Sequence, residues 1–146
     1  MSDLTFRIKA QSASAAKTIV KARNFELVID EPEDLGGSNS APNPVEYVLS
    51  AFAGCLNVMG HLIANEMGFT LNGLQIDISG NLNPARLFGQ SNEERAGYKS
   101  ILVKIKPDCN VDEATLEQWL SKVEERCPVS DNIQHPTPVK LELMKK

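Results

Sequence analysis

The sequence has few residues of the kinds that bind metals, with two histidines and three cysteines among 146 residues. A zinc site needs clustered ligands, and the histidines and cysteines show no such spacing. Neither G-x-x-x-x-G-K-[ST] nor G-x-G-x-x-G occurs, so the pair Gly36-Gly37 does not indicate a phosphate-binding loop. The sequence therefore predicts neither a metal site nor a bound cofactor.

Basic residues are not in excess, because 15 Lys and Arg stand against 19 Asp and Glu. With no basic stripe either, nucleic acid is not an expected partner. The opening residues lack the apolar region of a signal peptide, and polar side chains interrupt the most apolar segment, so no membrane span is predicted. We expect a cytoplasmic protein with one domain over residues 1–146. In a reducing compartment, its cysteines would be core residues, metal ligands or redox-active thiols.

The sequence does contain one long apolar segment, from Asn43 to Gly68, which reads as a single helix. Asn43 is a favourable N-cap, and Glu46, three residues later, completes the pattern of a capping box. Gly68 can supply the left-handed residue that ends the helix. A helix that is apolar around most of its circumference belongs in the middle of a fold. Cys55 lies near its centre among small residues.

The remaining segments alternate between strands and turns, with one further helix. A second helix is expected over residues 113–127, because Asp112 can cap it and Pro128 stops it. Loops are expected at 11–16, 31–42, 83–97 and 128–138, and strands at 4–10, 18–22, 25–30, 74–82, 98–107 and 139–144. This order predicts an α+β fold with helices packed on a mainly antiparallel sheet. A second apolar surface on the central helix suggests a homodimer.

Cys55 and Cys127 both occupy apolar faces of the two predicted helices. The face of Cys55 is shared by Phe52 and Met59, and Cys127 follows Val123 by one turn. If the two faces meet in the core, the thiols could alternate between a dithiol and a disulfide. The alternative is that both are inert core residues, as most buried cysteines are.

A redox cysteine must be a thiolate to act as a nucleophile, and apolar burial alone raises the pKa of a thiol. A nearby cation or hydrogen-bond donor is therefore required. The candidate cations are Arg23, Arg86, Arg95 and Arg126, and spacing alone does not choose between them.

The other cysteine and the histidines carry weaker signals. Cys109 lies in a loop between a strand and a helix and has no evident role. His61 lies about 120° around the helix from Cys55, which makes it a poor base and favours a surface or interface position. His135 is a loop histidine for which the sequence names no partner.

Three stretches together resemble a known family. They are LGGSNSAPNPVEYVLSAFAGCLN, with a glycine-rich loop and a first cysteine, RCPVSDNI, with a second cysteine, and RNFELVIDEP, a strand before the loop. With the strand first, the loop and first cysteine next and the second cysteine last, they are similar to the OsmC/Ohr family of thiol-dependent hydroperoxidases and OsmC-like proteins. The resemblance covers the chain from about residue 20 to its end. It implies an OsmC-like fold of two long helices with mainly antiparallel sheet, assembled as an intertwined homodimer.

The resemblance also implies a chemistry for the two cysteines. In peroxidase members the first cysteine attacks the peroxide O–O bond and becomes a sulfenic acid, and the second condenses with it to a disulfide. An external dithiol then restores the pair. Carried over, Cys55 is the peroxidatic thiol and Cys127 the resolving thiol. Apolar surroundings of Cys55 would favour small organic hydroperoxides over hydrogen peroxide.

One position departs from the family pattern. In peroxidase members a glutamate directly follows the proline and pairs with the activating arginine, whereas here Val45 holds that position and Glu46 comes next. Glu46 lies nine residues before Cys55. At about 100° per residue, this places the two side chains on opposite sides of an ideal helix, so Glu46 would point away from Cys55. Among the arginines, Arg23 matches the family best, with Arg95 as a fallback.

The leading expectation is therefore a peroxidase that acts in oxidative-stress defence through Cys55, Cys127, Arg23 and Glu46. The alternative is a non-peroxidase OsmC-like protein that binds a small apolar or thiol-bearing molecule in the dimer cleft. A third possibility is a fold retained without redox function.

Overall fold

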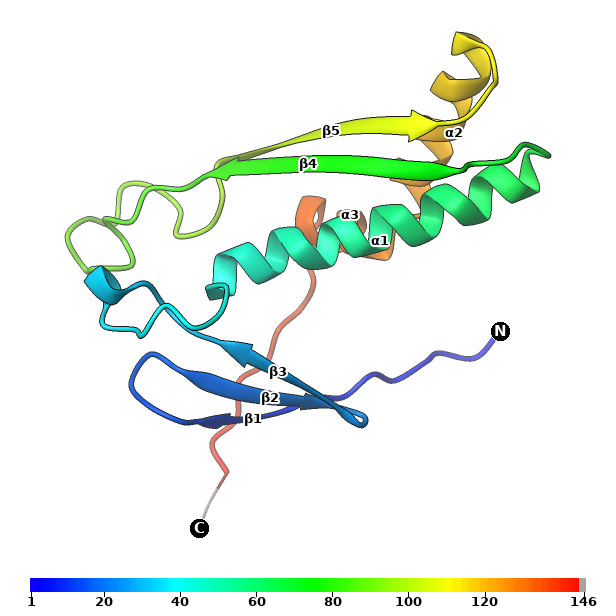
Figure 1. The fold of residues 1–146 in the computed structure, drawn as a ribbon. Helices are drawn as coiled ribbons and strands as arrows, with labels where there is room; N and C mark the ends of the chain where they lie inside the picture. Colours follow the sequence, from blue (N-terminus) through cyan, green and yellow to red (C-terminus); the bar gives the residue numbers. More distant parts are fainter. Residues whose placement is uncertain (145–146) are drawn as a thin grey trace. The chain divides into compact units, whose positions relative to one another are not determined.

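The computed structural model describes residues 1–144 of the chain and divides it into two compact units. The first unit comprises residues 1–50, and the second begins at Ala51. Both contain antiparallel sheet and helix (Figure 1), so the fold is α+β, as predicted.

The first unit holds a three-stranded antiparallel sheet in the order β1-β2-β3. Its strands are β1 (Lys9–Ser12), β2 (Thr18–Ala22) and β3 (Phe25–Ile29). The turn between β2 and β3 places Arg23 in the left-handed region, with φ 57°. The Arg23 guanidinium carbon lies 5.0 Å from the centroid of the Phe25 ring, a cation–π contact. Both strands predicted around this turn are confirmed.

The loop after β3 is organised by the buried carboxylate of Asp30, which has 0% exposure. The backbone N–H and hydroxyl groups of Ser38 and Ser40 all donate to this carboxylate, with hydroxyl distances of 2.7 and 2.8 Å. These bonds hold the pKa of Asp30 well below its usual range, with the Ser38 hydroxyl as the largest cause. Gly37 has to be glycine, because an added Cβ would lie 1.8 Å from the carbonyl oxygen of Glu31.

The long helix α1 (Pro44–Glu66) begins where the sequence predicts, with a capping box. The Asn43 N–H donates to Glu46 Oε2 at 2.8 Å, and the Glu46 N–H donates to Asn43 Oδ1 at 2.9 Å. The Tyr47 hydroxyl donates to the carbonyl oxygen of Val28 at 2.7 Å, which ties the first turn to β3. Beyond the other end of α1, Gly68 has φ 80°.

The second unit packs helices against one face of a hairpin. The hairpin consists of β4 (Gly73–Asn81) and β5 (Ser100–Asp108), and α2 (Glu113–Arg126) and α3 (Pro128–Gln134) follow it. Side chains on the hairpin alternate between half-buried and exposed. The half-buried set pairs across the strands and packs on the core, as with Ile76 opposite Ile105. Figure 1 shows α1 running alongside this hairpin.

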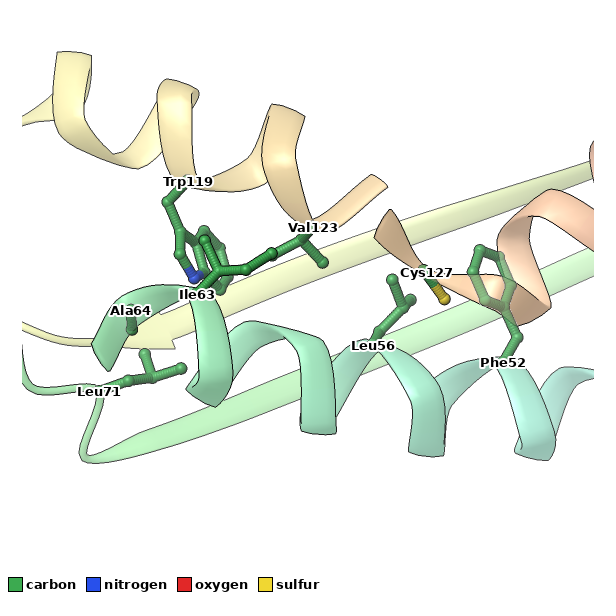
Figure 2. Close-up of a cluster of buried hydrophobic side chains, with 8 residues drawn as sticks. All are labelled: Phe52, Leu56, Ile63, Ala64, Leu71, Trp119, Val123 and Cys127. Carbon is green, nitrogen blue, oxygen red and sulfur yellow. The ribbon is translucent and has the colours of Figure 1, made fainter. Parts of the chain in front are cut away.

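The core of the second unit is built where α1 and α2 meet, and Figure 2 shows its side chains. Trp119 and Val123 from α2 are 2% and 0% exposed, as the apolar stripe predicted, whereas Leu120 is 45% exposed. The full cluster contains Phe52, Leu56, Ile63, Ala64, Leu71, Trp119, Val123 and Cys127.

Four predictions toward the ends of the chain are wrong. The strand predicted at residues 4–10 begins only at Lys9, and the predicted turn at 11–16 starts two residues late, because β1 extends to Ser12. No strand forms over residues 139–144. A strand needs a neighbour for its N–H and C=O groups, and within the described chain these segments have none. Residues 128–134, predicted as turn, form α3.

By length and composition alone, α1 is apolar enough to cross a membrane, although the polar side chains within it predict no span. A core helix of a soluble protein passes the same test, so this is weak evidence about a membrane.

Candidate thiol site

The structure brings the two helix cysteines together, with their sulfurs 3.0 Å apart. Both are free thiols, and a bonded pair would have its sulfurs about 2.0 Å apart. Cys127 is fully buried, whereas Cys55 is half-buried. In Figure 2 the Cys127 sulfur lies near Leu56 and Phe52, so the pair has apolar surroundings. Only a small movement separates this dithiol from a disulfide.

The packing of α2 on α1 brings the two sulfurs close together. The Trp119 indole N–H donates to the carbonyl oxygen of Gly60 at 2.9 Å. A Cβ at Gly60 would lie 3.1 Å from both the Trp119 ring and Leu74, so the glycine permits close packing. The same two helices meet again at the thiol pair, where Cys55 of α1 faces Cys127 directly after α2.

Cys127 is the junction between α2 and α3, as the C-cap of one helix and the N-cap of the other. Its sulfur accepts a hydrogen bond from the Ser130 N–H at 3.4 Å. The Val129 N–H in turn donates to the Cys55 sulfur. The first turn of α3 therefore directs one backbone donor at each sulfur, and such donors favour a thiolate. Sequence reasoning missed both, although Pro128 at the first helical position and Asp131 in the first turn indicate a helix start.

Burial and the Cys127 thiol together raise the pKa of Cys55 above its ordinary value, and burial is the larger cause. The hydrogen bond from the Val129 N–H lowers the pKa but does not offset them. Within the described residues, no cation is among the causes of this shift. The thiol therefore needs a further positive charge to become a good nucleophile at neutral pH.

Most of the candidate arginines are engaged elsewhere. Arg126 forms a bidentate ion pair with Glu66, and Arg86 donates to two carbonyl oxygens of its own loop. Arg95 is exposed in that loop. Arg23 stacks on Phe25 in the first unit, and its relation to Cys55 stays a prediction.

Glu46 is placed in the capping box with Asn43, which is the structural role that the sequence allowed for it. Val45 occupies the family position of the glutamate, at the second residue of α1.

The remaining candidates lie outside the thiol pair. His135 has a partner that the sequence did not name, because its Nδ1 lies 3.0 Å from Asp131 Oδ1. Cys109 packs on the core cluster, and His61 is exposed on α1. Among residues 1–144, no group of three or more His, Cys, Asp and Glu side chains is arranged to hold a metal ion.

Comparison with known proteins identifies the family of the chain. A family model described as OsmC-like protein matches residues 37–142, a region that includes Cys55 and Cys127. The chain belongs to the OsmC-like protein family. No curated protein matches this sequence.

Solved structures share the OsmC-like fold at low sequence identity. An OsmC-like protein from Mycoplasma pneumoniae superposes with TM-score 0.79 at 19% identity, covering 91% of this chain and 89% of that one. An organic hydroperoxide resistance protein OsmC from Legionella pneumophila gives 0.68 at 21% identity, covering 92% of each chain. An organic hydroperoxide resistance protein from Elizabethkingia anophelis, with thiocyanate bound, gives 0.66 at 17% identity and covers 91% and 90%. These likenesses show the fold, and the chemistry rests on the residues of this chain.

Proposed function

We propose that this OsmC-like protein acts in hydroperoxide resistance and oxidative-stress defence, as a thiol peroxidase that reduces small organic hydroperoxides. The observation that carries the proposal is the 3.0 Å separation of the Cys55 and Cys127 sulfurs. Two of the similar structures are hydroperoxide resistance proteins, which supports the same class of substrate.

The reaction uses the two thiols in sequence. The Cys55 thiolate attacks the distal peroxide oxygen, the O–O bond breaks, and the alkoxide leaves as an alcohol after it takes a proton. Cys55 is then a sulfenic acid. Cys127 attacks its sulfur, a disulfide forms, and water leaves. An external dithiol reduces the disulfide by two exchanges and is itself oxidised. Cys55 packs on the same apolar core cluster as the half-buried Met59, and apolar surroundings favour organic peroxides.

The site as described lacks a cation for the thiolate, and we assign that role to Arg23. The assignment rests on the match of Arg23 to the family pattern and on the raised pKa of Cys55, which calls for a positive charge. Glu46 is a weaker assignment, because its carboxylate already accepts the Asn43 N–H.

We also propose that the protein is a homodimer. In the second unit α1 leaves apolar side chains exposed, with Val58 at 63% and Leu62 at 44%. A Cβ at Gly54, on the same helix, would meet nothing within 4 Å. The end segments carry alternating exposed apolar residues that another copy could cover as strands, namely Leu4, Phe6, Ile8, Val139, Leu141 and Leu143. Sedimentation that gives only monomer would refute this part of the proposal.

Stopped-flow oxidation of the reduced protein by cumene hydroperoxide and by hydrogen peroxide tests the function. Cys55→Ser should abolish fast consumption of the organic peroxide. Cys127→Ser should leave the first step intact but stop disulfide formation. Cys109→Ser is the matched control and should behave as wild type. Oxidation no faster than that of free cysteine would overturn the proposal.

Two further variants test the assigned helpers. Arg23→Met should slow the first step at neutral pH, because the thiolate loses its cation. Glu46→Ala should lower stability through the lost cap by about 1 kcal/mol. If Glu46→Ala also slows the first step as strongly as Arg23→Met, then Glu46 acts in catalysis as well.

The second candidate function is binding of a small apolar or thiol-bearing molecule in the dimer cleft. The raised pKa of Cys55 and the capping role of Glu46 favour it, because both leave the thiol poorly activated. Slow peroxide reaction combined with a ligand retained in native mass spectrometry would support this candidate.

A further inference from the structure

The ion pair between Glu66 and Arg126 joins the far ends of two helices. Glu66 is the last residue of α1, and Arg126 is the last residue of α2. The guanidinium contacts both carboxylate oxygens, and its second nitrogen lies 3.0 Å from Glu66 Oε1. A bidentate geometry of this kind fixes orientation as well as distance.

The position of Cys127 depends on this helix end. Cys127 directly follows Arg126 and has already left the helical conformation, with φ −79° and ψ 110°. The next residue of α2 that is anchored in the core is Val123, about one turn earlier. Helix ends open more readily than helix centres, and opening of the last turn would carry the Cys127 sulfur away from Cys55.

We propose that the Glu66–Arg126 ion pair is a positioning device for Cys127, which holds the end of α2 closed and keeps the two sulfurs within reach. The proposal rests on the proposed function in that it deepens the role of the same thiol pair. Arg126, one of the arginines considered for activating Cys55, thereby acquires a different task. It acts on the resolving step and not on the first attack.

The expected effect is modest, because the side chains of Arg126 and Glu66 are 42% and 44% exposed. Exposed ion pairs contribute about 0.2–1 kcal/mol. We therefore expect loss of the pair to lower the effective concentration of Cys127 toward Cys55 by about 1.4- to 5-fold. Lys122, whose charge also acts on Glu66, will replace part of the interaction when Arg126 is removed.

Thiol–disulfide exchange with glutathione measures that effective concentration without any peroxide. Cys55 first forms a mixed disulfide with oxidised glutathione and releases one reduced glutathione. Cys127 then attacks the Cys55 sulfur, the protein disulfide forms, and a second reduced glutathione leaves. At half-oxidation, the square of the reduced glutathione concentration divided by the oxidised glutathione concentration gives the effective concentration, and Cys127→Ser isolates the first exchange.

The experiment uses the single variants Arg126→Met and Glu66→Gln and the charge-swapped double variant Glu66→Arg with Arg126→Glu. Each is made in full-length protein that also carries Cys109→Ser. Lys99→Met is the matched control, because it removes the exposed Lys99–Glu94 pair, whose nitrogen and oxygen lie 3.0 Å apart. The two single variants should lower the effective concentration of Cys127 by the factor given above. Formation of the mixed disulfide at Cys55 should be unchanged. The charge-swapped double variant should restore the effective concentration, and Lys99→Met should match wild type.

Three results would overturn the proposal. Disulfide formation in the single variants could equal that of wild type, or both exchanges could slow together. Alternatively, the free energy of unfolding could fall while the effective concentration stays the same, which would make the pair merely structural. Failure of the peroxide assay leaves this experiment unaffected, so the two proposals fail independently.

Discussion

Trp119 donates its indole N–H to the carbonyl oxygen of Gly60, and this bond fixes where α2 rests on α1. The ring is 2% exposed and lies against Gly60, where an added Cβ would come within 3.1 Å of it. The Cys55–Cys127 pair lies between α1 and the end of α2, so the same contact helps to determine which residue of α1 faces Cys127. The thiol pair is thus a consequence of packing two turns away.

Trp119→Phe should therefore lower stability and loosen the thiol pair. It removes a buried hydrogen bond and part of a buried ring, which together should cost about 1–3 kcal/mol. Urea unfolding should show a lower midpoint with an unchanged slope. Leu120→Ala on the exposed side of α2 is the control and should change stability by less than about 1 kcal/mol. A Trp119→Phe variant as stable as wild type would show that the bond does not seat the helix.

Asp30→Asn should destabilise the first unit in a pH-dependent way. The folded pKa of Asp30 lies below its ordinary value of 3.8, so its stabilising effect is complete above that pH and is lost as the pH falls toward the folded pKa. The variant should be less stable than wild type at pH 7, and the difference should narrow below pH 3.8. Urea unfolding at several pH values measures this.

Asp34→Asn provides the control for Asp30, because it makes the same charge change at an exposed residue of the same loop. It should leave both the stability and its pH dependence nearly as in wild type. Equal effects of the two substitutions would mean that net charge, and not the hydrogen bonds of Ser38 and Ser40, governs the acid response.

The parts of the fold that could be predicted are those with local signals. The start of α1 is marked by Asn43 and Glu46, which contact each other within one turn, and β2 and β3 turn at Arg23. The helix α3 was missed because it is short and its N-cap is a cysteine sulfur, which is not a usual capping group. The alternation at residues 139–144 predicts a strand, but pairing depends on a neighbour that the sequence pattern does not specify.

The thiol site could also be predicted only in part. Helical spacing placed Cys55 and Cys127 on apolar faces, and the structure brings their sulfurs together. The donors at the two sulfurs, the N–H groups of Val129 and Ser130, belong to backbone and leave no side-chain pattern to recognise. The partner of Arg126 was equally hidden, because Glu66 is 60 residues away in the sequence.

Removal of the Cys127 thiol should lower the pKa of Cys55. That thiol is one of the causes that raise the Cys55 pKa, and burial, which the smaller side chain reduces, is the other. In Cys127→Ala the rate of Cys55 alkylation by iodoacetamide should therefore reach its midpoint at a lower pH than in wild type. Mass spectrometry of the Cys55 peptide separates this reaction from that of the other cysteines. Cys109→Ala should leave the midpoint unchanged. A midpoint that stays the same or rises in Cys127→Ala would mean that the Cys127 thiol does not raise the pKa of Cys55.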